Sequence, residues 1–354
     1  YEVPWGAAVA LDPSTGRVLA YVSHSSAERD AGDLVLDASP PTASVFKIVT
    51  ASALVESGVN PADEVCYHGG ASRLTEGNLE DDPTRDRRCA TLSDAMGGSI
   101  NAVFAKLAVQ RLDAPTLERF ASAFGFGQPI PFDVPTRQSA MEVPTDRLEF
   151  ARTSAGFWHM HMSPLHGALL AATIANHGRM ARPTLVDEVI DARGSMTYEA
   201  HSAILREVIP EGTAQAVAAM MQRTVGRGGT ARRYFFDQSG NAFLPGIDAA
   251  GKTGTLAGSD PYRGYTWFVG FAPVNDPEIA VAALVVNEPR WRIKGAFVAR
   301  EAMRHWLVTR PRLQRQAARE AERAATRAAA EQEAAERQEA EAQVEPAGAA
   351  PSAP

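Results

Sequence analysis

Lysine is nearly absent from this sequence of 354 residues. Its four lysines are Lys47, Lys106, Lys252 and Lys294, and the rest of its 35 basic residues are arginines. An arginine guanidinium stays protonated inside a protein, whereas a lysine removed from water can lose its proton and act as a base. Because Lys47 and Lys252 stand close to serine and threonine hydroxyls in the sequence, they indicate proton-transfer chemistry.

The sequence also lacks an excess of positive charge and a long apolar run. Its formal net charge is −7, which argues against a nucleic-acid-binding protein, since such proteins usually carry a basic patch. No run of about 18 apolar residues occurs, so we expect no membrane span within this chain. The chain begins Tyr1-Glu2-Val3 without a signal peptide. We therefore expect an excised or processed fragment, in which missing targeting says little about where the parent protein works.

Cysteine is scarce as well, because only Cys66 and Cys89 occur. Two cysteines in one segment are typical of a disulfide in an oxidising compartment. Cys66, His68 and Cys89 could also supply three zinc ligands, but no second histidine follows at the spacing of a zinc finger. We expect a disulfide rather than a zinc site, with a reduced structural pair as a third alternative. We expect no metal and no cofactor elsewhere.

Short apolar segments near both ends of the body predict β-strands. The predicted strands are 6–12, 17–24, 249–256, 265–272 and 279–286. The first two flank turn residues at 12–16 and predict a hairpin. Strands that follow one another through short turns pair antiparallel. We therefore predict an α/β (α+β) fold with one five-stranded antiparallel sheet, built from about 5–24 and 249–287 and flanked by helices.

The middle of the chain predicts helices. The predicted helices are 42–57, 92–96, 102–112, 115–124, 165–176, 213–225 and 296–307. We expect a mostly helical lobe over about 60–180, although its polar stretch 60–88 predicts a loop. From Pro311 onward the composition changes to Ala, Glu, Arg and Gln, which predicts a helical tail that ends in disorder. We thus expect one domain at 1–310 and a tail at 311–354.

Ser44 and Lys47 form the first candidate motif. They lie three residues apart on a predicted helix, so their side chains share a face. Pro41 just upstream places Ser44 in the first turn, where free N–H groups and the helix dipole favour a developing negative charge. A buried lysine beside a hydroxyl loses its proton more easily and can activate that hydroxyl. The pair predicts a nucleophilic serine with a lysine base, although this spacing alone often arises by chance.

Two later motifs add polar groups. Ser99-Ile100-Asn101 offers a hydroxyl for a proton relay and a carboxamide that could hold a substrate amide, with a helix cap as the alternative. Lys252-Thr253-Gly254-Thr255 lies on a predicted strand, where glycine lets another backbone approach closely. Its lysine and threonines could bind a carboxylate, and a strand N–H could form an oxyanion hole with the N–H of Ser44. An ordinary sheet lysine is the alternative.

In this order, the three motifs resemble those of the superfamily of penicillin-binding protein transpeptidases and serine β-lactamases. The resemblance covers about 9–307. It includes Leu11-Asp12-Pro13-Ser14-Thr15-Gly16, Met162-Ser163-Pro164-Leu165-His166 and Gly229-Thr230-Ala231-Arg232-Arg233. These stretches look more like transpeptidases than lactamases. The resemblance implies a β-lactamase/transpeptidase-like fold.

The resemblance also implies a role for each catalytic residue. Ser44 would attack the carbonyl between two D-Ala residues of a peptidoglycan stem peptide, and Lys47 would take its proton. Ser99 with Lys252 would pass a proton to the departing D-Ala. An amine from a second stem peptide would then attack the acyl-enzyme and form a cross-link. The implied activity is that of a serine-type D-Ala-D-Ala transpeptidase, an acyltransferase of cell-wall synthesis.

Substrate-binding roles follow from the same resemblance. Asn101 would hold the amide of the stem peptide, while Thr253, Gly254 and Thr255 would receive its terminal carboxylate. The N–H of Thr255 would share the oxyanion hole. β-Lactams, which mimic D-Ala-D-Ala, would trap Ser44. The implied partners are peptidoglycan stem peptides and other proteins of cell-wall synthesis. The implied location is periplasmic, on the outer face of the inner membrane, with the parent tethered to that membrane by a segment absent here.

The sequence lacks a segment that one class of β-lactamases uses, which helps to choose between a transpeptidase and a lactamase. Class A lactamases use a Glu-x-x-Leu-Asn segment, and none lies between Asn101 and Lys252. Glu142 and Glu149 occupy that region without its context. We therefore expect a transpeptidase. The alternatives are a hydrolase of the same superfamily, either a D,D-carboxypeptidase or a β-lactamase, and a non-catalytic β-lactam sensor.

For several other residues we expect roles outside catalysis. We expect Lys106 and Lys294 to be surface or helix-end cations. We expect His159 and His161 to make polar contacts rather than to bind a metal as a pair, because no third ligand accompanies them. Arg232 and Arg233 could steer an anionic peptide, although a solvated basic turn is the default interpretation.

Overall fold

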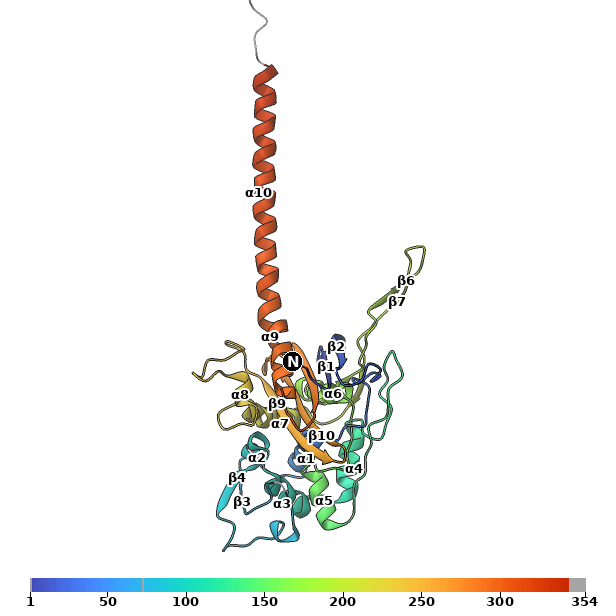
Figure 1. Ribbon diagram of the computed structural model, residues 1–354, viewed down its shortest axis with the longest axis vertical. Helices are drawn as coiled ribbons and strands as arrows, with labels where there is room; N and C mark the ends of the chain where they lie inside the picture. Colours follow the sequence, from blue (N-terminus) through green and yellow to red (C-terminus); the bar gives the residue numbers. More distant parts are fainter. Residues whose placement is uncertain (1, 72, 344–354) are drawn as a thin grey trace, which may run out of the picture. The chain divides into compact units, whose positions relative to one another are not determined.

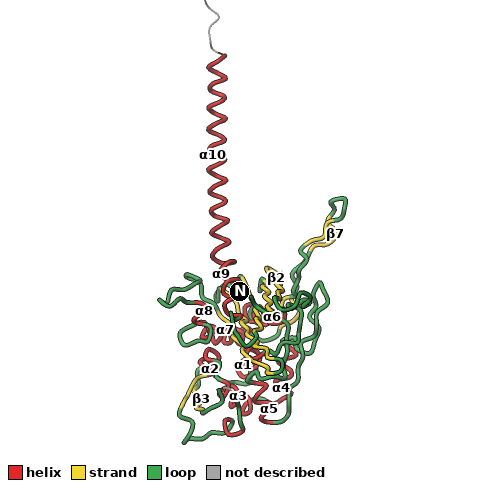
Figure 2. Tube along the Cα trace, in the orientation of Figure 1, coloured by secondary structure: helices red, strands yellow, loops and turns green. Residues whose placement is uncertain are grey.

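The computed structural model describes residues 2–71 and 73–343. The chain divides into two compact units, Tyr1–Arg304 and His305–Pro354. The first unit contains all the strands that the structure describes, and Figure 2 shows how they interleave with helices.

A five-stranded antiparallel sheet organises the first unit, with the strand order β2-β1-β11-β10-β9. Its strands are β1 Trp5–Leu11, β2 Val18–Ser25, β9 Ala250–Ser259, β10 Tyr262–Ala272 and β11 Ile279–Asn287. Because β1 pairs with β11, segments from opposite ends of the unit meet within the sheet (Figure 1). The predicted fold class is confirmed. The strand with the Lys-Thr-Gly-Thr motif, β9, forms one edge of the sheet.

Helices cover both faces of this sheet, which explains why all nine residues of β11 are buried. The covering helices are α6 Pro164–Ala175 and α9 Gly295–Arg304. Gly167 of α6 lies against the side chain of Ala282, whereas Gly295 of α9 lies against the backbone of Ala283. Neighbouring residues of a strand point to opposite faces, so a strand covered on both sides reads as one continuous apolar run.

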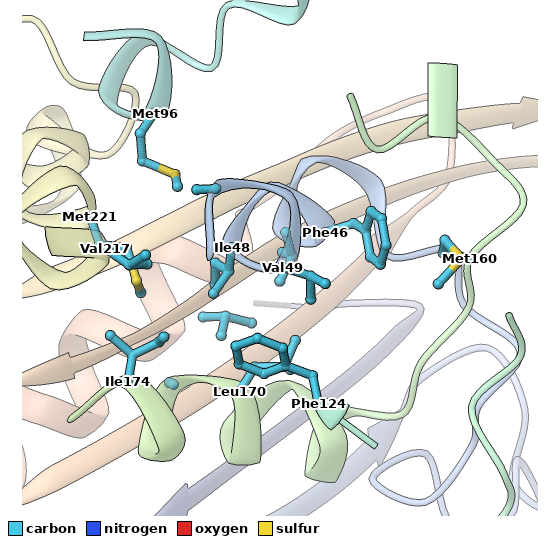
Figure 3. Packing of buried hydrophobic residues seen from close by; sticks show 14 of the residues in the cluster. Phe46, Ile48, Val49, Met96, Phe124, Met160, Leu170, Ile174, Val217 and Met221 are labelled. Atoms are coloured by element: carbon cyan, nitrogen blue, oxygen red, sulfur yellow. The ribbon is translucent and has the colours of Figure 1, made fainter. Parts of the chain in front are cut away.

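The helix α1 (Lys47–Glu56) runs through the core of the first unit. All its residues from 47 to 54 are buried. Figure 3 shows Ile48 and Val49 among apolar side chains from other helices, including Leu170 and Val217. Full burial of such a side chain contributes about 1.5–3 kcal/mol, so this packing holds the helix firmly. Since the helix is enclosed, its first residue, Lys47, is carried into the interior.

The other helices surround this core. They are α2 Leu92–Gly98, α3 Asn101–Arg111, α4 Ala114–Ala123, α5 Arg147–Ser154, α7 Glu211–Val225 and α8 Arg232–Phe235. Side-chain caps explain where some begin. Asp113 accepts a hydrogen bond from the N–H of Thr116 before α4, and Asp146 accepts from the N–H of Glu149 within α5. The sequence did not predict α5 or α8, because such short segments carry little periodicity.

The prediction of a loop over 60–88 is wrong in part. Within and beside it, β3 (Glu64–Tyr67) pairs with β4 (Arg88–Thr91). Cys66 lies opposite Cys89 in this pair, and a disulfide joins them. The two sulfurs are therefore bonded to each other rather than free for zinc. The other small sheets are β5 Arg179–Ala181 with β8 Ile204–Glu207 and β6 Glu188–Ile190 with β7 Met196–Glu199.

The second unit begins with a π-helical turn at His305–Thr309 and continues as α10, Arg310–Gln343. The domain boundary expected at residue 311 stays a prediction. The disordered end expected for the tail falls on residues 344–354, which lie outside the described residues. Across 2–71 and 73–343, no helix combines the length and the apolarity needed to cross a membrane.

Candidate active site

Ser44 lies on a tight turn that leads into α1. The 3-10 turn η1 (Ala43–Phe46) precedes the helix, and Ala43 has a positive φ of 48°. Gly156 fits closely against this turn, because a Cβ there would lie 2.3 Å from the carbonyl oxygen of Ala43 and 2.9 Å from the Cα of Ser44. Only glycine permits this approach at its own φ of 82°. The sequence analysis did not single out Gly156.

Lys47 is fully buried directly behind Ser44. Its Nζ donates hydrogen bonds to the Ser44 Oγ at 3.0 Å and to the Asn101 Oδ1 at 2.8 Å, and also to the Ala155 carbonyl. Burial, and secondly the charge of Lys252, lowers the pKa of Lys47 well below its ordinary value. An amine that readily gives up its proton thus lies within hydrogen-bonding distance of a hydroxyl, as a general base requires.

A second serine–lysine pair faces the first. Lys252 is also fully buried, and its Nζ donates to the Ser99 Oγ at 2.9 Å and to the Thr253 carbonyl at 3.0 Å. Burial lowers the pKa of Lys252 to about 7. Ser99 ends α2 in the left-handed conformation, with a φ of 56°, and Asn101 begins α3 two residues later. The turn between two helices therefore positions both residues of this motif.

The motif on β9 closes the site from the side of the sheet. A Cβ on Gly254 would lie 3.2 Å from the Cβ of Ala43 and 3.2 Å from the carbonyl of Thr42. Glycine therefore lets this edge strand approach the turn that carries Ser44. The Thr253 and Thr230 hydroxyls are 2.6 Å apart, which ties the strand to the segment before α8.

These groups meet at one pocket of about 380 Å³. Its walls include Ser44, Ser99, Asn101, Thr253, Gly254 and Thr255. Lys47 and Lys252 lie buried behind the two serines that line it. The structure thus brings together the eight residues that the sequence predicted for catalysis and substrate binding, from segments more than 200 positions apart. Their catalytic roles stay predictions.

Other wall residues were missed or misjudged. Thr230, Arg233 and Lys294 also line the pocket. Lys294 directly precedes α9, so the helix-end position expected for it is confirmed. Lys106 is misjudged, since it is 0% exposed and paired with Asp86. Whether a lysine side chain is buried depends on the tertiary fold, so composition could not distinguish Lys106 from Lys294.

The acidic residues and histidines of 140–161 lie outside the pocket wall. Glu149 pairs with Arg152, and its Oε2 lies 2.9 Å from the His159 Nε2. The Glu142 side chain is 76% exposed. His161 contacts the Ser39 carbonyl through Nδ1. Within the described residues, no group of three or more His, Cys, Asp or Glu side chains could hold a metal ion.

The chain is similar to proteins of one known family. A family model described as "Penicillin binding protein transpeptidase domain" matches residues 6–306. The chain is 29% identical over 321 residues to the peptidoglycan D,D-transpeptidase PbpA of Mycobacterium tuberculosis, covering 80% of this chain and 62% of that protein. It is 30% identical over 312 residues to PbpA of Mycolicibacterium smegmatis, covering 79% and 61%. The chain therefore spans about six tenths of the length of these curated relatives.

Solved structures give the same picture of the fold. A penicillin G acyl-enzyme complex of penicillin-binding protein A from M. tuberculosis matches with a TM-score of 0.66 and 26% identity, covering 83% of this chain and 72% of that one. The D,D-transpeptidase domain of a peptidoglycan glycosyltransferase from Eggerthella lenta matches with a TM-score of 0.70 and 25% identity, covering 87% and 78%.

Proposed function

Because this chain belongs to the penicillin-binding protein transpeptidase family, we propose that it is the catalytic part of a D,D-transpeptidase that cross-links peptidoglycan stem peptides through an acyl-enzyme on Ser44. The observation that carries this proposal is the pair of buried lysines, each with its Nζ within 3.0 Å of a serine hydroxyl at one pocket. Such an arrangement can move protons to and from a reacting group without water.

In the first step, the Ser44 Oγ attacks the carbonyl carbon between the last two D-Ala residues. The neutral Lys47 amine accepts the hydroxyl proton as the O–C bond forms. The backbone N–H groups of Ser44 and Thr255 stabilise the negative charge on the carbonyl oxygen. The C–N bond then breaks, and the Ser99 hydroxyl, supplied by Lys252, passes a proton to the leaving amine of D-Ala.

In the second step, the amine of a second stem peptide attacks the acyl-enzyme. A new C–N bond forms as the bond to the Ser44 Oγ breaks. Lys47 returns to the Ser44 Oγ the proton that it took in the first step, and the attacking amine's proton passes through Ser99 to Lys252, which restores both lysines. Asn101 holds the amide of the first stem peptide meanwhile. Since the substrate is peptidoglycan, the protein acts outside the cytoplasmic membrane, where the Cys66–Cys89 disulfide can persist. Because peptidoglycan is built at the outer face of that membrane, we also propose that the parent protein is tethered to the membrane and works with other proteins of cell-wall synthesis.

The positions of the nearby acids support a transpeptidase over a lactamase. A lactamase needs a base that activates water to free the acylated serine. Glu149 is engaged by Arg152 and His159, the Glu142 side chain is exposed, and neither lines the pocket. We therefore propose that β-lactams are inhibitors that leave a long-lived adduct.

The proposal predicts two products. Incubation with a stem pentapeptide ending in D-Ala-D-Ala and an acceptor peptide with a free amine should release D-Ala and yield a cross-linked dimer. Incubation with penicillin should raise the intact mass by that of the whole drug, and this adduct should persist for many minutes. Mass spectrometry measures both. If the pentapeptide loses D-Ala and no dimer forms, the protein is a carboxypeptidase. If penicillin is hydrolysed and the enzyme is left without an adduct, the protein is a lactamase.

Two cations on the pocket wall support a substrate that ends in a carboxylate. Arg233 and Lys294 line the pocket together with Thr253. The Lys294 Nζ lies over the ring of Trp291, and Arg233 donates a hydrogen bond to the Tyr234 hydroxyl. Within the described residues, neither cation pairs with a carboxylate. Burial, and secondly the charge of Arg233, lowers the pKa of Lys294. The two charges are thus close and uncompensated, and a bound carboxylate would offset them.

Lys294→Met should therefore slow the reaction of the pentapeptide with a free C-terminal carboxylate by roughly 10-fold, the effect of losing one charge-assisted hydrogen bond. The same peptide with an amidated C-terminus should react slowly and equally with wild type and variant. kcat/KM for both peptides is the measurement. Arg290→Met, an exposed cation outside the pocket wall, is the control and should leave both values unchanged. Equal losses on both peptides would contradict this role for Lys294.

A further inference from the structure

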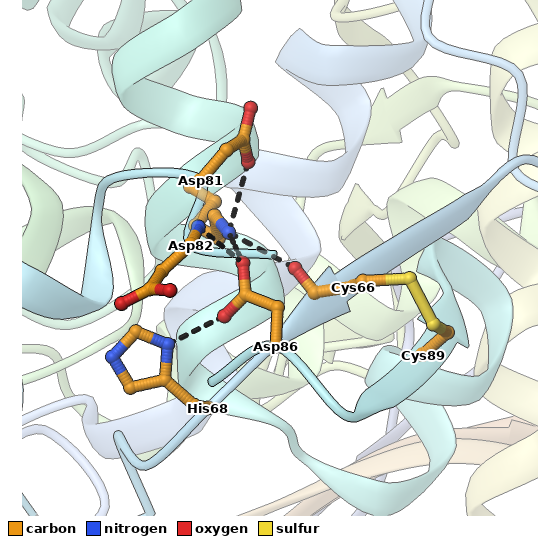
Figure 4. The surroundings of a disulfide bond; sticks show 7 residues. Cys66, His68, Asp81, Asp82, Asp86 and Cys89 are labelled. Carbon is orange, nitrogen blue, oxygen red and sulfur yellow. Dashed lines mark hydrogen bonds and ion pairs between the residues drawn. A yellow bond between two sulfur atoms is a disulfide. The ribbon is translucent and has the colours of Figure 1, made fainter. Parts of the chain in front are cut away.

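Figure 4 shows Asp81, Asp86 and His68 beside the Cys66–Cys89 disulfide. Lys106 joins them in a polar cluster outside the pocket wall. Its Nζ donates to the Asp86 Oδ2 at 2.7 Å, to the Asp81 Oδ1 at 3.0 Å and to the Cys66 carbonyl at 3.0 Å. Burial alone would lower the pKa of Lys106, but the hydrogen bonds with Asp86 and Asp81 outweigh it and raise the pKa. Asp86 also contacts the His68 Nδ1.

This cluster is costly to bury. Taking an ammonium and a carboxylate out of water opposes folding unless both are fully hydrogen-bonded. Here the three N–H groups of the ammonium have three acceptors. A Leu or Met would fill the same space without that cost, so apolar packing alone does not explain a lysine at position 106. The segments that the cluster holds together explain this lysine better.

The cluster ties the cysteine hairpin to α3. Lys106 is on α3, whereas Cys66 is on β3 and Asp86 lies just before β4. The chain leaves β3 through His68 and then packs on the first turn of α3. A Cβ on Gly70 would lie only 2.8 Å from the Cβ of Ala102. The segment 66–71 is thus fixed to α3 at two points, through Lys106 and through Gly70.

The end of that segment contacts the active site. The Ala71 carbonyl accepts a hydrogen bond from the Asn101 Nδ2 at 2.7 Å, while the Asn101 Oδ1 accepts from the Lys47 Nζ at 2.8 Å. A carbonyl can only accept, so Ala71 requires the NH₂ end of the carboxamide to face it. The oxygen end is then left for Lys47. Ala71 also lines the pocket beside Asn101.

We propose that Lys106 is a positioning residue for the reaction at Ser44. It holds the segment 66–71 against α3, so that the Ala71 carbonyl keeps the Asn101 carboxamide turned with its oxygen toward Lys47. Asn101 and Lys106 are five residues apart on the same helix, which spans about 7–8 Å. The helix therefore supplies a rigid link between the cluster and the carboxamide. This inference rests on the proposed function, because it concerns the same acylation.

Lys106→Met should lower the second-order rate of acylation by penicillin roughly 10-fold. Because Lys106 acts through Asn101, the two substitutions should not add. The double variant with Asn101→Ala should react as slowly as Asn101→Ala alone. Stopped-flow or quenched mass spectrometry on the intact protein gives all four rates, at a temperature at least 20 °C below each measured Tm. Arg88→Met is the matched control, because Arg88 is an exposed cation on β4 of the same hairpin and makes none of the Lys106 hydrogen bonds. We expect a wild-type rate.

The alternatives predict different results. A merely structural Lys106 would lower Tm and leave the acylation rate of folded protein unchanged, which overturns the proposal. The proposal is also overturned if adding Lys106→Met to Asn101→Ala lowers the acylation rate by the same factor as Lys106→Met alone. If Lys106→Met does not fold, Asp86→Asn, which keeps the shape and removes the charge, is compared with Asn101→Ala in the same way. A wild-type protein that penicillin does not acylate would refute the proposed function itself, and this outcome is visible before any variant is made.

Discussion

Ser44→Ala should abolish the covalent adduct with penicillin completely, so that the intact mass of the variant stays unchanged after hours of exposure. The reason is that the Oγ is the only atom that forms the bond in the proposed mechanism. Removing a catalytic serine typically costs about 10⁶-fold in rate. The measurement is intact-mass spectrometry over time, with peptide mapping of the wild-type adduct to the segment that contains Ser44.

The matched control comes from the second serine–lysine pair. Ser99 lies 2.9 Å from the Lys252 Nζ, a geometry close to the 3.0 Å between Lys47 and Ser44, so distance alone does not choose the nucleophile. The position of Ser44 at the start of a helical turn does, because free N–H groups there stabilise an oxyanion. Ser99→Ala should therefore still form the adduct, more slowly. Labelling that survives Ser44→Ala and vanishes in Ser99→Ala would exchange their roles.

Lys47→Arg should reduce the acylation rate by about 10³-fold, within the range expected for loss of a general base. Arginine keeps the positive charge and cannot give up its proton, so the substitution removes basicity selectively. Because Lys47 is 0% exposed, the larger arginine could disturb the fold. Lys47→Met, which has similar length and no charge, should show the same loss. Tm and circular dichroism establish that each variant is folded. Acylation of either folded variant at the wild-type rate would refute the role of Lys47.

The pH dependence follows from the same residue. The lowered pKa of Lys47 means that the wild-type amine is neutral at the upper end of the pH range and takes up a proton as the pH falls. Acylation should therefore decline on the acid side, where Lys47 is protonated. It should decline again above about pH 7, where Lys252, whose pKa is about 7, loses the proton that Ser99 passes to the leaving amine. Lys47→Met should react slowly and lack the acid decline, so an acid decline that persists in Lys47→Met would contradict the role of Lys47.

The sequence predicted the sheet well because its strands are long and the turns between them are short. The apolar run of β11 and the hairpin of β1 and β2 are local patterns in the sequence, and the packing of the folded unit agrees with them. The sequence failed at β3 and β4, four residues each. Strands that short lie mostly at the surface and alternate too few times to show a period.

The site was predicted residue by residue, but its surroundings were not. Ser44 and Lys47 share a helical face, and this spacing survives folding because it is local. Gly156 and Ala71 support the site only through tertiary contacts, with the turn at Ala43 and with Asn101. No hydrophobic period and no sequence motif indicates such contacts. The sequence therefore identified the reacting groups but not the residues that hold them in place.

The two buried lysines have a consequence for the folded state as a whole. On unfolding, Lys252 returns to water, and its pKa rises from about 7 toward 10.5. Lys47 changes in the same direction. Between about pH 7 and 10.5 the unfolded chain binds more protons than the native one, so the free energy of unfolding increases with pH across this window, and below it the whole penalty is present. Acid thus weakens the native state through the two amines that the proposed reaction uses as proton acceptor and proton donor.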